Sequence, residues 1–317
     1  MEFATKCLRA GYQPKNGEPG ALPIVQSTTY KYDTTEEVAK LFDLQAAGFF
    51  YSRLANPTVD SVEQKIAALE GGVGAICTSS GQAAAFLSVM NIAQSGDHIV
   101  ACSNLYGGSI NLLAVTLKRF GVEVSFIDES LPNEELSKAF RPNTKAVFSE
   151  TIANPSTRVL DIERIAKLAH DHGVPLIIDN SFATPYLCRP IEYGADIVMH
   201  STSKYIDGHA LSVGGVVVDS GNFDWLAHKD KFPEFAQPDE SYHGCKYVEA
   251  FGKAAYIVKA RVQLIRDLGF LQSPQNAFYI NQGLETLPLR MDRYSSNALE
   301  VAKFLKHSSA CNFVPKS

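Results

Sequence analysis

Short runs of apolar residues alternate along most of the chain with stretches in which apolar side chains recur every three or four positions. The runs have the length of buried strands, and the periodic stretches have the period of amphipathic helices. The predicted strands lie at 73–77, 99–102, 122–127, 146–149, 174–178, 197–199 and 213–218. The main predicted helices lie at 57–70, 81–93, 109–120 and 162–172. Wholly apolar strands that alternate with helices are typical of an α/β fold, with a mostly parallel sheet and helices on both faces.

The two ends of the chain depart from this alternation. Residues 1–55 are rich in turn-forming residues and lack a sustained period, so we expect an N-terminal arm that makes subunit contacts. Asn56 and Pro57 are residue types typical of a helix N-cap and first helical position, and residues 56–247 form the predicted α/β domain. From 248 to 317 the pattern is helical, and we expect an interdomain helix followed by the start of a C-terminal domain. The amphipathic stretches there lie at about 246–268 and 288–306.

Composition and charge are those of an ordinary globular protein. The 317 residues are 45% hydrophobic and 20% charged, and a chain of this length can bury a substantial core. The formal net charge is −5 and no long basic run is present, so we expect neither nucleic acid nor a membrane as a partner. No apolar run approaches the about 20 residues of a membrane helix. The six cysteines are scattered without a C-x-x-C pair, which favours reduced thiols and a cytoplasmic location.

Polar residues follow the predicted strands directly, at the carboxyl ends where ligands bind in an open parallel sheet. These segments are Ser79-Ser80-Gly81-Gln82, Tyr106-Gly107-Gly108, Glu150 with Asn154, Asp179-Asn180, and Ser201-Thr202-Ser203-Lys204. Ser79-Ser80-Gly81 leads into a helix whose free N–H groups suit a phosphate, although it can also serve only as a helix cap. Asp179 lies at the end of an apolar strand, where it serves either as a helix cap or as the partner of a cation. Lys204 is either a solvated lysine or a reactive amine.

The three features together point to one cofactor. Pyridoxal phosphate requires an anion cradle for its phosphate, a carboxylate beside its pyridine nitrogen and a lysine that forms an imine with it. The helix that begins near Gly81, the Asp179 carboxylate and the Lys204 amine would meet these needs at adjacent strand ends.

Six ordered motifs that cover nearly the whole chain resemble the Cys/Met-metabolism family of pyridoxal phosphate enzymes, which have the aspartate-aminotransferase-like fold type I. The motifs are Tyr51-Ser-Arg53-Leu-Ala-Asn-Pro-Thr58, Ser79-Ser-Gly81, Leu105-Tyr106-Gly107, Glu150-Thr-Ile-Ala-Asn154-Pro155, Asp179-Asn-Ser-Phe-Ala-Thr-Pro185 and Ser201-Thr-Ser-Lys204-Tyr. Within the family, the branch that acts on O-acetylhomoserine and sulfide is most similar. The segments that carry this finer likeness are Tyr106–Leu112, Val216–Asp219 with Phe223–Trp225, and Pro238–Gly244.

The resemblance implies roles for individual residues. Lys204 becomes the Schiff-base lysine, Asp179 the partner of the pyridine nitrogen, and Tyr106 the phenol that stacks on the ring and assists catalysis. Phosphate binding falls to Gly81, Gln82, Ser201 and Ser203, and Glu150 and Asn154 lie near the ring. Tyr51 and Arg53 are implied to reach the phosphate of a neighbouring subunit, in a homotetramer built from active dimers.

The activity that the resemblance implies is γ-replacement, in which O-acetyl-L-homoserine and sulfide give L-homocysteine and acetate during methionine biosynthesis. A methionine γ-lyase, a cystathionine γ-synthase or lyase, and a catalytically silent interaction subunit remain alternatives. In sulfur-lyase relatives a cysteine often follows the Tyr-Gly pair, whereas Gly108 stands there in this chain. The family's second domain continues past the point reached at Ser317 and supplies an arginine for the substrate carboxylate. We therefore expect the C-terminal α+β domain to be incomplete here.

Two further motifs receive structural interpretations. His170-Asp-His172 ends a predicted helix beside Gly173, where histidines favour the helix dipole, and we expect no metal site. Gly71-Gly-Val-Gly74 precedes its strand, whereas a dinucleotide-binding glycine motif follows one, which argues against an NAD-dependent dehydrogenase.

Overall fold

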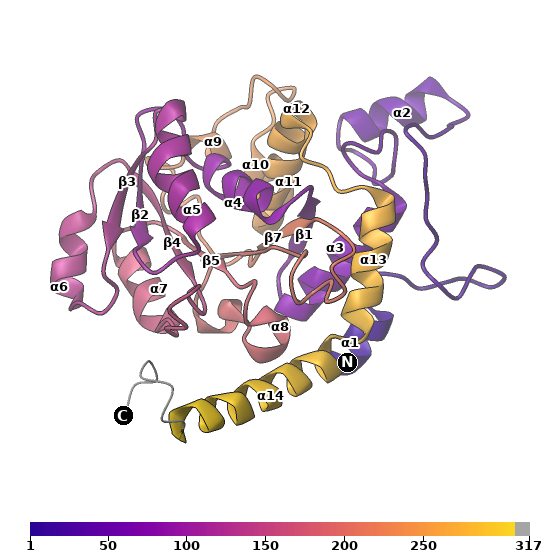
Figure 1. Ribbon diagram of the computed structural model, residues 1–317. Coiled ribbons are helices and arrows are strands. Elements are labelled where there is room, and N and C mark those ends of the chain that lie inside the picture. The colour runs from indigo at the N-terminus through magenta and orange to yellow at the C-terminus, as the bar shows by residue number, and fades with distance from the viewer. Residues whose placement is uncertain (308–317) are drawn as a thin grey trace.

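A seven-stranded sheet with helices on both faces forms the centre of the protein, as the computed structural model, which describes residues 1–307, shows (Figure 1). The strand order is β1-β7-β6-β5-β4-β2-β3. Only β7 runs antiparallel to its neighbours, β1 and β6. The strands are β1 Gly74–Thr78, β2 His98–Cys102, β3 Glu123–Ile127, β4 Thr144–Glu150, β5 Leu176–Asp179, β6 Ile197–His200 and β7 Gly215–Asp219. All seven predicted strands are present, and the predicted α/β fold is confirmed.

The central strands are buried along almost their whole length, which explains the apolar run in each of them. Every residue of β2, β4, β6 and β7 is buried, including Phe148 in the middle of β4. Burying a large side chain of this kind contributes about 1.5–3 kcal/mol, and the sheet forms the middle layer of a core to which the surrounding helices also contribute. A rigid sheet of this kind holds its strand ends, and the side chains on them, in fixed positions.

Local capping signals match the starts of α3 (Pro57–Glu70) and α4 (Gly81–Met90), whereas α4 ends three residues before the predicted 93 and the predicted helix at 109–120 is divided into three short helical segments. Asn56 caps α3 by accepting hydrogen bonds from the backbone of Thr58 and Val59, and Gly71 ends it in the left-handed conformation at φ 84°. Ser80 caps α4. The other helical segments in this region are α5 Gly107–Asn111, η1 Leu112–Thr116, η2 Leu117–Phe120, α6 Asn133–Leu136, η3 Ser137–Ala139, α7 Ile162–Asp171, α8 Thr184–Leu187, η4 Pro190–Tyr193 and α9 Pro233–Ala236.

The N-terminal arm contains two helices that the sequence pattern does not predict. The side chain of Cys7 in α1 (Phe3–Arg9) is fully buried, and Lys6 Nζ donates to the Ala68 carbonyl of α3 at 3.0 Å, so α1 packs on the body. Helix α2 (Thr35–Phe42) begins with a capping box and stands to one side of the sheet (Figure 1). Each helix is only about two turns long and buries a single residue, which is too short for a periodic signal.

The helices after the sheet connect it to a long terminal helix. Helix α11 (Ala255–Ala260) packs on β1 and β7, where Tyr256 is fully buried. The neighbouring segments are α10 Tyr247–Phe251, η5 Gly252–Ala254, η6 Arg261–Ile265, α12 Arg266–Leu268 and α13 Pro274–Glu285. Helix α14 (Leu287–His307) runs along the lower edge of the molecule and ends away from the sheet (Figure 1). The last ten residues of the predicted C-terminal segment, 308–317, lie outside the described residues.

Within residues 1–307, no helix is both long and apolar enough to cross a membrane.

Candidate active site

Neighbouring parallel strands bring several predicted site residues to the carboxyl end of the sheet. Glu150 is the last residue of β4, Asp179 is the last residue of β5, and the two are paired in register. The turn after β6 carries Ser201 and Lys204. The carboxyl ends of three adjacent strands therefore supply two carboxylates, a hydroxyl and an amine.

Ser181, which the sequence analysis did not single out, joins Asp179 to Ser201. The Asp179 Oδ1 atom accepts hydrogen bonds from the Ser181 backbone N–H at 2.9 Å and from the Ser181 hydroxyl at 2.5 Å. The same hydroxyl oxygen accepts from the Ser201 backbone N–H at 2.6 Å. The sequence indicated this role of Ser181 only through its position two residues after Asp179, where a serine or threonine hydroxyl can close a turn.

The Asp179 carboxylate is prepared to bind a cationic group. Burial raises its pKa, whereas the hydrogen bonds from Ser181 and the charge of His200 lower it. Its hydrogen bonds within the described residues all end on Oδ1. The second oxygen, Oδ2, is thus available to accept from a protonated ring nitrogen, which would relieve the cost of the buried charge.

The predicted anion cradle is formed where α4 begins. The Ser80 side chain accepts from the Ala83 backbone N–H at 3.1 Å, which leaves the N–H groups of Gly81 and Gln82 at the open first turn. A Cβ atom on Gly81 would lie 2.5 Å from the Ser201 Cβ atom. Glycine is therefore required for the helix to approach the turn after β6, and this contact places two predicted phosphate ligands side by side.

Ser203 and Lys204 lie in the same turn, but only the Ser203 side chain has a hydrogen-bond partner within residues 1–307. The Ser203 hydroxyl donates to the Gly214 carbonyl at 3.1 Å and accepts from the Gly214 N–H at 2.9 Å. Its single proton is committed to that loop, so phosphate binding by this side chain requires another rotamer. Lys204 is exposed, and within residues 1–307 its Nζ atom has neither a hydrogen bond nor an ion pair. The amine is thus free to react.

Tyr106 is placed beside this edge by Glu150. The Glu150 carboxylate accepts from the backbone N–H of Tyr106 at 2.6 Å and from that of Asn154 at 3.1 Å. Burial, together with the charge of Asp179, raises the pKa of Glu150 to about 7. Glu150 thus holds two predicted site residues through their backbones, while the Tyr106 ring remains half exposed.

The side chains of Tyr106 and Gln82 meet over Gly108. A Cβ atom at this position would lie 2.4 Å from the Tyr106 ring and 2.6 Å from the Gln82 amide nitrogen. The glycine therefore lets an aromatic ring and an amide approach each other next to the cradle. Any larger residue at 108 has to displace one of them.

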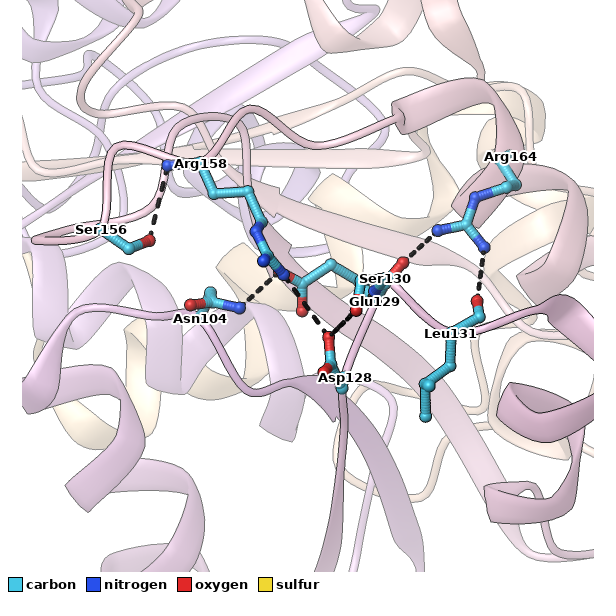
Figure 2. A network of polar contacts seen from close by, with 8 residues as sticks. All are labelled: Asn104, Asp128, Glu129, Ser130, Leu131, Ser156, Arg158 and Arg164. Atoms are coloured by element: carbon cyan, nitrogen blue, oxygen red, sulfur yellow. Dashed lines mark hydrogen bonds and ion pairs between the residues drawn. The ribbon is translucent and has the colours of Figure 1, made fainter. Parts of the chain in front are cut away.

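A polar network that the sequence analysis missed ties together the loops around Tyr106 and Asn154 (Figure 2). Asn104 donates to the Glu129 side chain at 2.6 Å, and Arg158 lies 3.6 Å from the same carboxylate and 3.5 Å from Asp128. Asn104 precedes Tyr106 by two residues, and Arg158 follows Asn154 by four. The acidic pair directly after β3 was the signal in the sequence that could have indicated it.

Tyr51 and Arg53 do not join the residues at the strand ends within this chain. The Arg53 guanidinium lies over the Tyr51 ring, 5.2 Å from its centre. Both residues line a separate cavity of about 470 Å³ between the arm and the segment near Tyr242. The cavity is lined by Thr29, Tyr30, Val38, Phe42, Phe50, Tyr51, Arg53, Leu54, Tyr242, His243 and Arg266.

The histidines of the His170-Asp-His172 motif have structural partners. His170 Nε2 lies 2.8 Å from Asp196 Oδ2, and the His172 ring stacks on Phe140 with a centre distance of 3.9 Å. Among the described residues, no three His, Cys, Asp or Glu side chains are grouped as metal ligands.

The strand-end residues fit pyridoxal phosphate. The open helix terminus at Gly81 suits its phosphate, the free Oδ2 of Asp179 suits its ring nitrogen, and the unpaired Lys204 amine suits its aldehyde. The sheet and this site define a pyridoxal phosphate-dependent enzyme of fold type I. The chain belongs to the family of Cys/Met metabolism PLP-dependent enzymes, whose model matches residues 4–315.

Curated proteins and solved structures show the same relationship. The chain is 48% identical to a homocysteine/cysteine synthase of Kluyveromyces lactis, over 98% of this chain and 71% of that protein. It is 48% identical to an O-acetyl-L-homoserine sulfhydrylase of Leptospira meyeri, over 95% of this chain and 70% of that protein. A putative O-acetylhomoserine (thiol)-lyase structure from Campylobacter jejuni, which contains a pyridoxyl-lysine monophosphate, matches with a TM-score of 0.94 and 37% identity, over 98% of this chain and 76% of that one.

Proposed function

We propose that this chain is a pyridoxal phosphate-dependent O-acetylhomoserine sulfhydrylase. The reaction replaces the acetate of O-acetyl-L-homoserine by sulfide and yields L-homocysteine and acetate. The observation that carries the proposal is that Asp179 and the turn with Ser201 and Lys204 end adjacent strands, while Gly81 at the start of α4 packs against Ser201. Support for the substrate comes from relatives named homocysteine synthase and O-acetyl-L-homoserine sulfhydrylase, at 44–48% identity over nearly all of this chain.

The proposed cofactor contacts follow from the positions of the side chains. The N–H groups of Gly81 and Gln82 and the hydroxyl of Ser201 would hold the phosphate, with Ser203 as a further ligand after a change of rotamer. Asp179 Oδ2 would accept from the pyridine nitrogen, and Tyr106 would cover the ring. Glu150 and Asn154 support this arrangement from the neighbouring strand and loop.

The chain's own residues move the protons of the reaction. Pyridoxal phosphate, when bound, provides an electron sink that stabilises negative charge at the substrate Cα. Lys204 Nζ is the mobile base and acid in this proposal, because it is exposed and, within residues 1–307, unpaired. The Tyr106 hydroxyl assists proton transfer near the leaving acetate. Asp179 Oδ2 would accept a hydrogen bond from a protonated pyridine nitrogen, and that cation would relieve the cost of burial that raises the pKa of the carboxyl.

The proposed assembly is a homotetramer built from active dimers. Tyr51 and Arg53 lie on the arm and line a cavity apart from the strand ends of their own chain. The active site that they can complete is therefore that of a neighbouring subunit. An arginine suits this task because its planar guanidinium can bind phosphate through two hydrogen bonds. We also propose a cytoplasmic location, where the free thiols of the described cysteines stay reduced.

The test supplies each candidate substrate to the purified, cofactor-loaded protein. O-acetylhomoserine with sulfide should release homocysteine and acetate in equal amounts. O-acetylhomoserine with cysteine tests for cystathionine, and methionine alone tests for 2-oxobutyrate from γ-elimination. Lys204→Ala serves as the inactive control. Faster formation of 2-oxobutyrate or cystathionine than of homocysteine would overturn the proposed activity.

A further inference from the structure

A second row of polar side chains lies at the same strand ends and takes no part in the proposed chemistry. Its members are Thr151, Asn180 and His200, each of them buried. Each is adjacent in sequence to a residue of the proposed site, because side chains at the end of a strand alternate between its two faces. The adjacent site residues are Glu150, Asp179 and Ser201.

Hydrogen bonds link this row across the strands. The Thr151 hydroxyl donates to Asn180 Oδ1 at 2.8 Å, and the Asn180 backbone N–H donates to the Met199 carbonyl at 2.8 Å. Asn180 Nδ2 also donates to the Cys188 carbonyl at 2.9 Å. The row is therefore fixed relative to β4, β6 and the residue that follows α8.

Glu70, the last residue of α3, is the hub of the row. Its Oε1 atom accepts from His200 Nε2 at 2.6 Å and from Asn180 Nδ2 at 2.9 Å. The side chains of Glu70 and His200 are both 0% exposed. One carboxylate oxygen thus holds the residue after Asp179 and the residue before Ser201.

Burying the Glu70–His200 pair costs more free energy than a contact that only stabilises the fold would need to. The desolvation of a fully buried pair of this kind offsets much of its attraction. Within residues 1–307, Glu70 Oε2 and His200 Nδ1 also lack a hydrogen-bond partner, and each unpaired buried polar atom adds to that cost. In other proteins, apolar residues of similar size often replace such a pair without loss of stability. The cost therefore points to a role in placing the neighbouring site residues.

We propose that Glu70 is a positioning residue for cofactor binding, which acts through Asn180 on Asp179 and through His200 on Ser201. This inference rests on the proposed function because it takes Asp179 and Ser201 as ligands of pyridoxal phosphate. Glu70 does not touch the cofactor. It sets the separation between the carboxylate for the ring nitrogen and the hydroxyl for the phosphate.

The experiment titrates cofactor-free full-length protein with pyridoxal phosphate and records both the dissociation constant and the visible spectrum of the bound cofactor. Glu70→Ala should weaken binding about tenfold or more, as expected when a hydrogen bond to a charged group is lost, and should shift the absorption band. Glu70→Gln keeps an oxygen acceptor in place, so it should retain most of the affinity. Glu70→Gln also removes the negative charge beside His200, so its bound cofactor should still show a shifted band, and this variant provides the test if Glu70→Ala does not fold.

Asp196→Asn is the matched control. Asp196 is also a buried carboxylate bonded to a histidine, but it precedes β6 and so lies at the opposite edge of the sheet. This variant should lower the melting temperature without changing cofactor affinity or spectrum. Glu70 variants with wild-type affinity and spectrum would overturn the inference, as would an equal loss of affinity in Asp196→Asn. No readout uses O-acetylhomoserine, so a wild-type protein that binds the cofactor without turning this substrate over would contradict only the proposed function.

Discussion

Glu150 and Asp179 stand side by side at the carboxyl ends of β4 and β5, where the two strands pair them in register. Two carboxylates so close together in a buried place repel each other when both are charged, and the pKa of Glu150 is raised to about 7 by burial and by Asp179. Glu150 nevertheless accepts two backbone hydrogen bonds that position Tyr106 and Asn154. The protonation state of Glu150 is therefore coupled to the hydrogen bonds that position Tyr106 and Asn154.

The raised pKa of Glu150 makes stability depend on pH. Between its ordinary value of 4.5 and about 7, the folded protein binds a proton that the unfolded chain has lost, so the free energy of unfolding falls as pH rises through this interval. We expect Glu150→Gln to remove on the order of 2 kcal/mol of the difference between pH 5 and pH 8. A constant loss of about 1 kcal/mol should accompany it, because an amide can accept only one of the two backbone hydrogen bonds well.

Urea denaturation of the cofactor-free protein at the two pH values measures this effect. Glu240→Gln, at an exposed position, is the control and should leave the pH dependence as in the wild type. An unchanged pH dependence in Glu150→Gln would show that the carboxylate titrates at its ordinary value.

Much of the fold and part of the site could be predicted because their signals are local. Most strands contain a short apolar run, Asp179 directly follows one such run, and Lys204 lies in the turn after another. The contacts of Glu70 could not be predicted in this way, because its partner His200 is 130 positions away and only the folded chain brings them together. The hydrogen bond between the Ser203 hydroxyl and Gly214 could not be predicted for the same reason, because it depends on how the following loop folds back onto the turn.

Lys204 should carry the cofactor covalently. Reduction of the loaded protein with borohydride followed by mass spectrometry of its peptides is expected to find the added mass on Lys204, because its amine is free at the strand ends. Lys204→Ala should lose turnover by several orders of magnitude while the open terminus of α4 still binds the cofactor weakly. Lys253→Ala, at an exposed lysine outside the site, is the control. Recovery of the label on a different lysine would overturn the assignment.

Gly108 should be required for the position of the Tyr106 ring. A Cβ atom there would lie within 2.6 Å of both Tyr106 and Gln82, and relieving such a clash costs about 1–3 kcal/mol. We expect Gly108→Ala to lower kcat about tenfold or more. Gly107→Ala is the matched control, since a Cβ atom at 107 has no neighbour within 4 Å. Equal kcat values for the variants at 107 and 108 would contradict the steric argument.

Arg53 should act across a subunit boundary. Its side chain lines a cavity with Tyr51 on the arm, whereas Lys204 lies at the strand ends, so an active site would combine Arg53 of one subunit with Lys204 of the other. Arg53→Ala and Lys204→Ala proteins should each be nearly inactive alone. Each mixed dimer then contains one site with both residues intact and one site with neither. After complete random exchange half of the dimers are mixed, and each of these has one intact site of two. The mixture should therefore recover about a quarter of wild-type activity. Native mass spectrometry of differently tagged subunits measures the fraction of mixed dimers, and Lys253→Ala in place of Arg53→Ala controls for effects of mixing. Mixed dimers without restored activity would show that each site is built from a single chain.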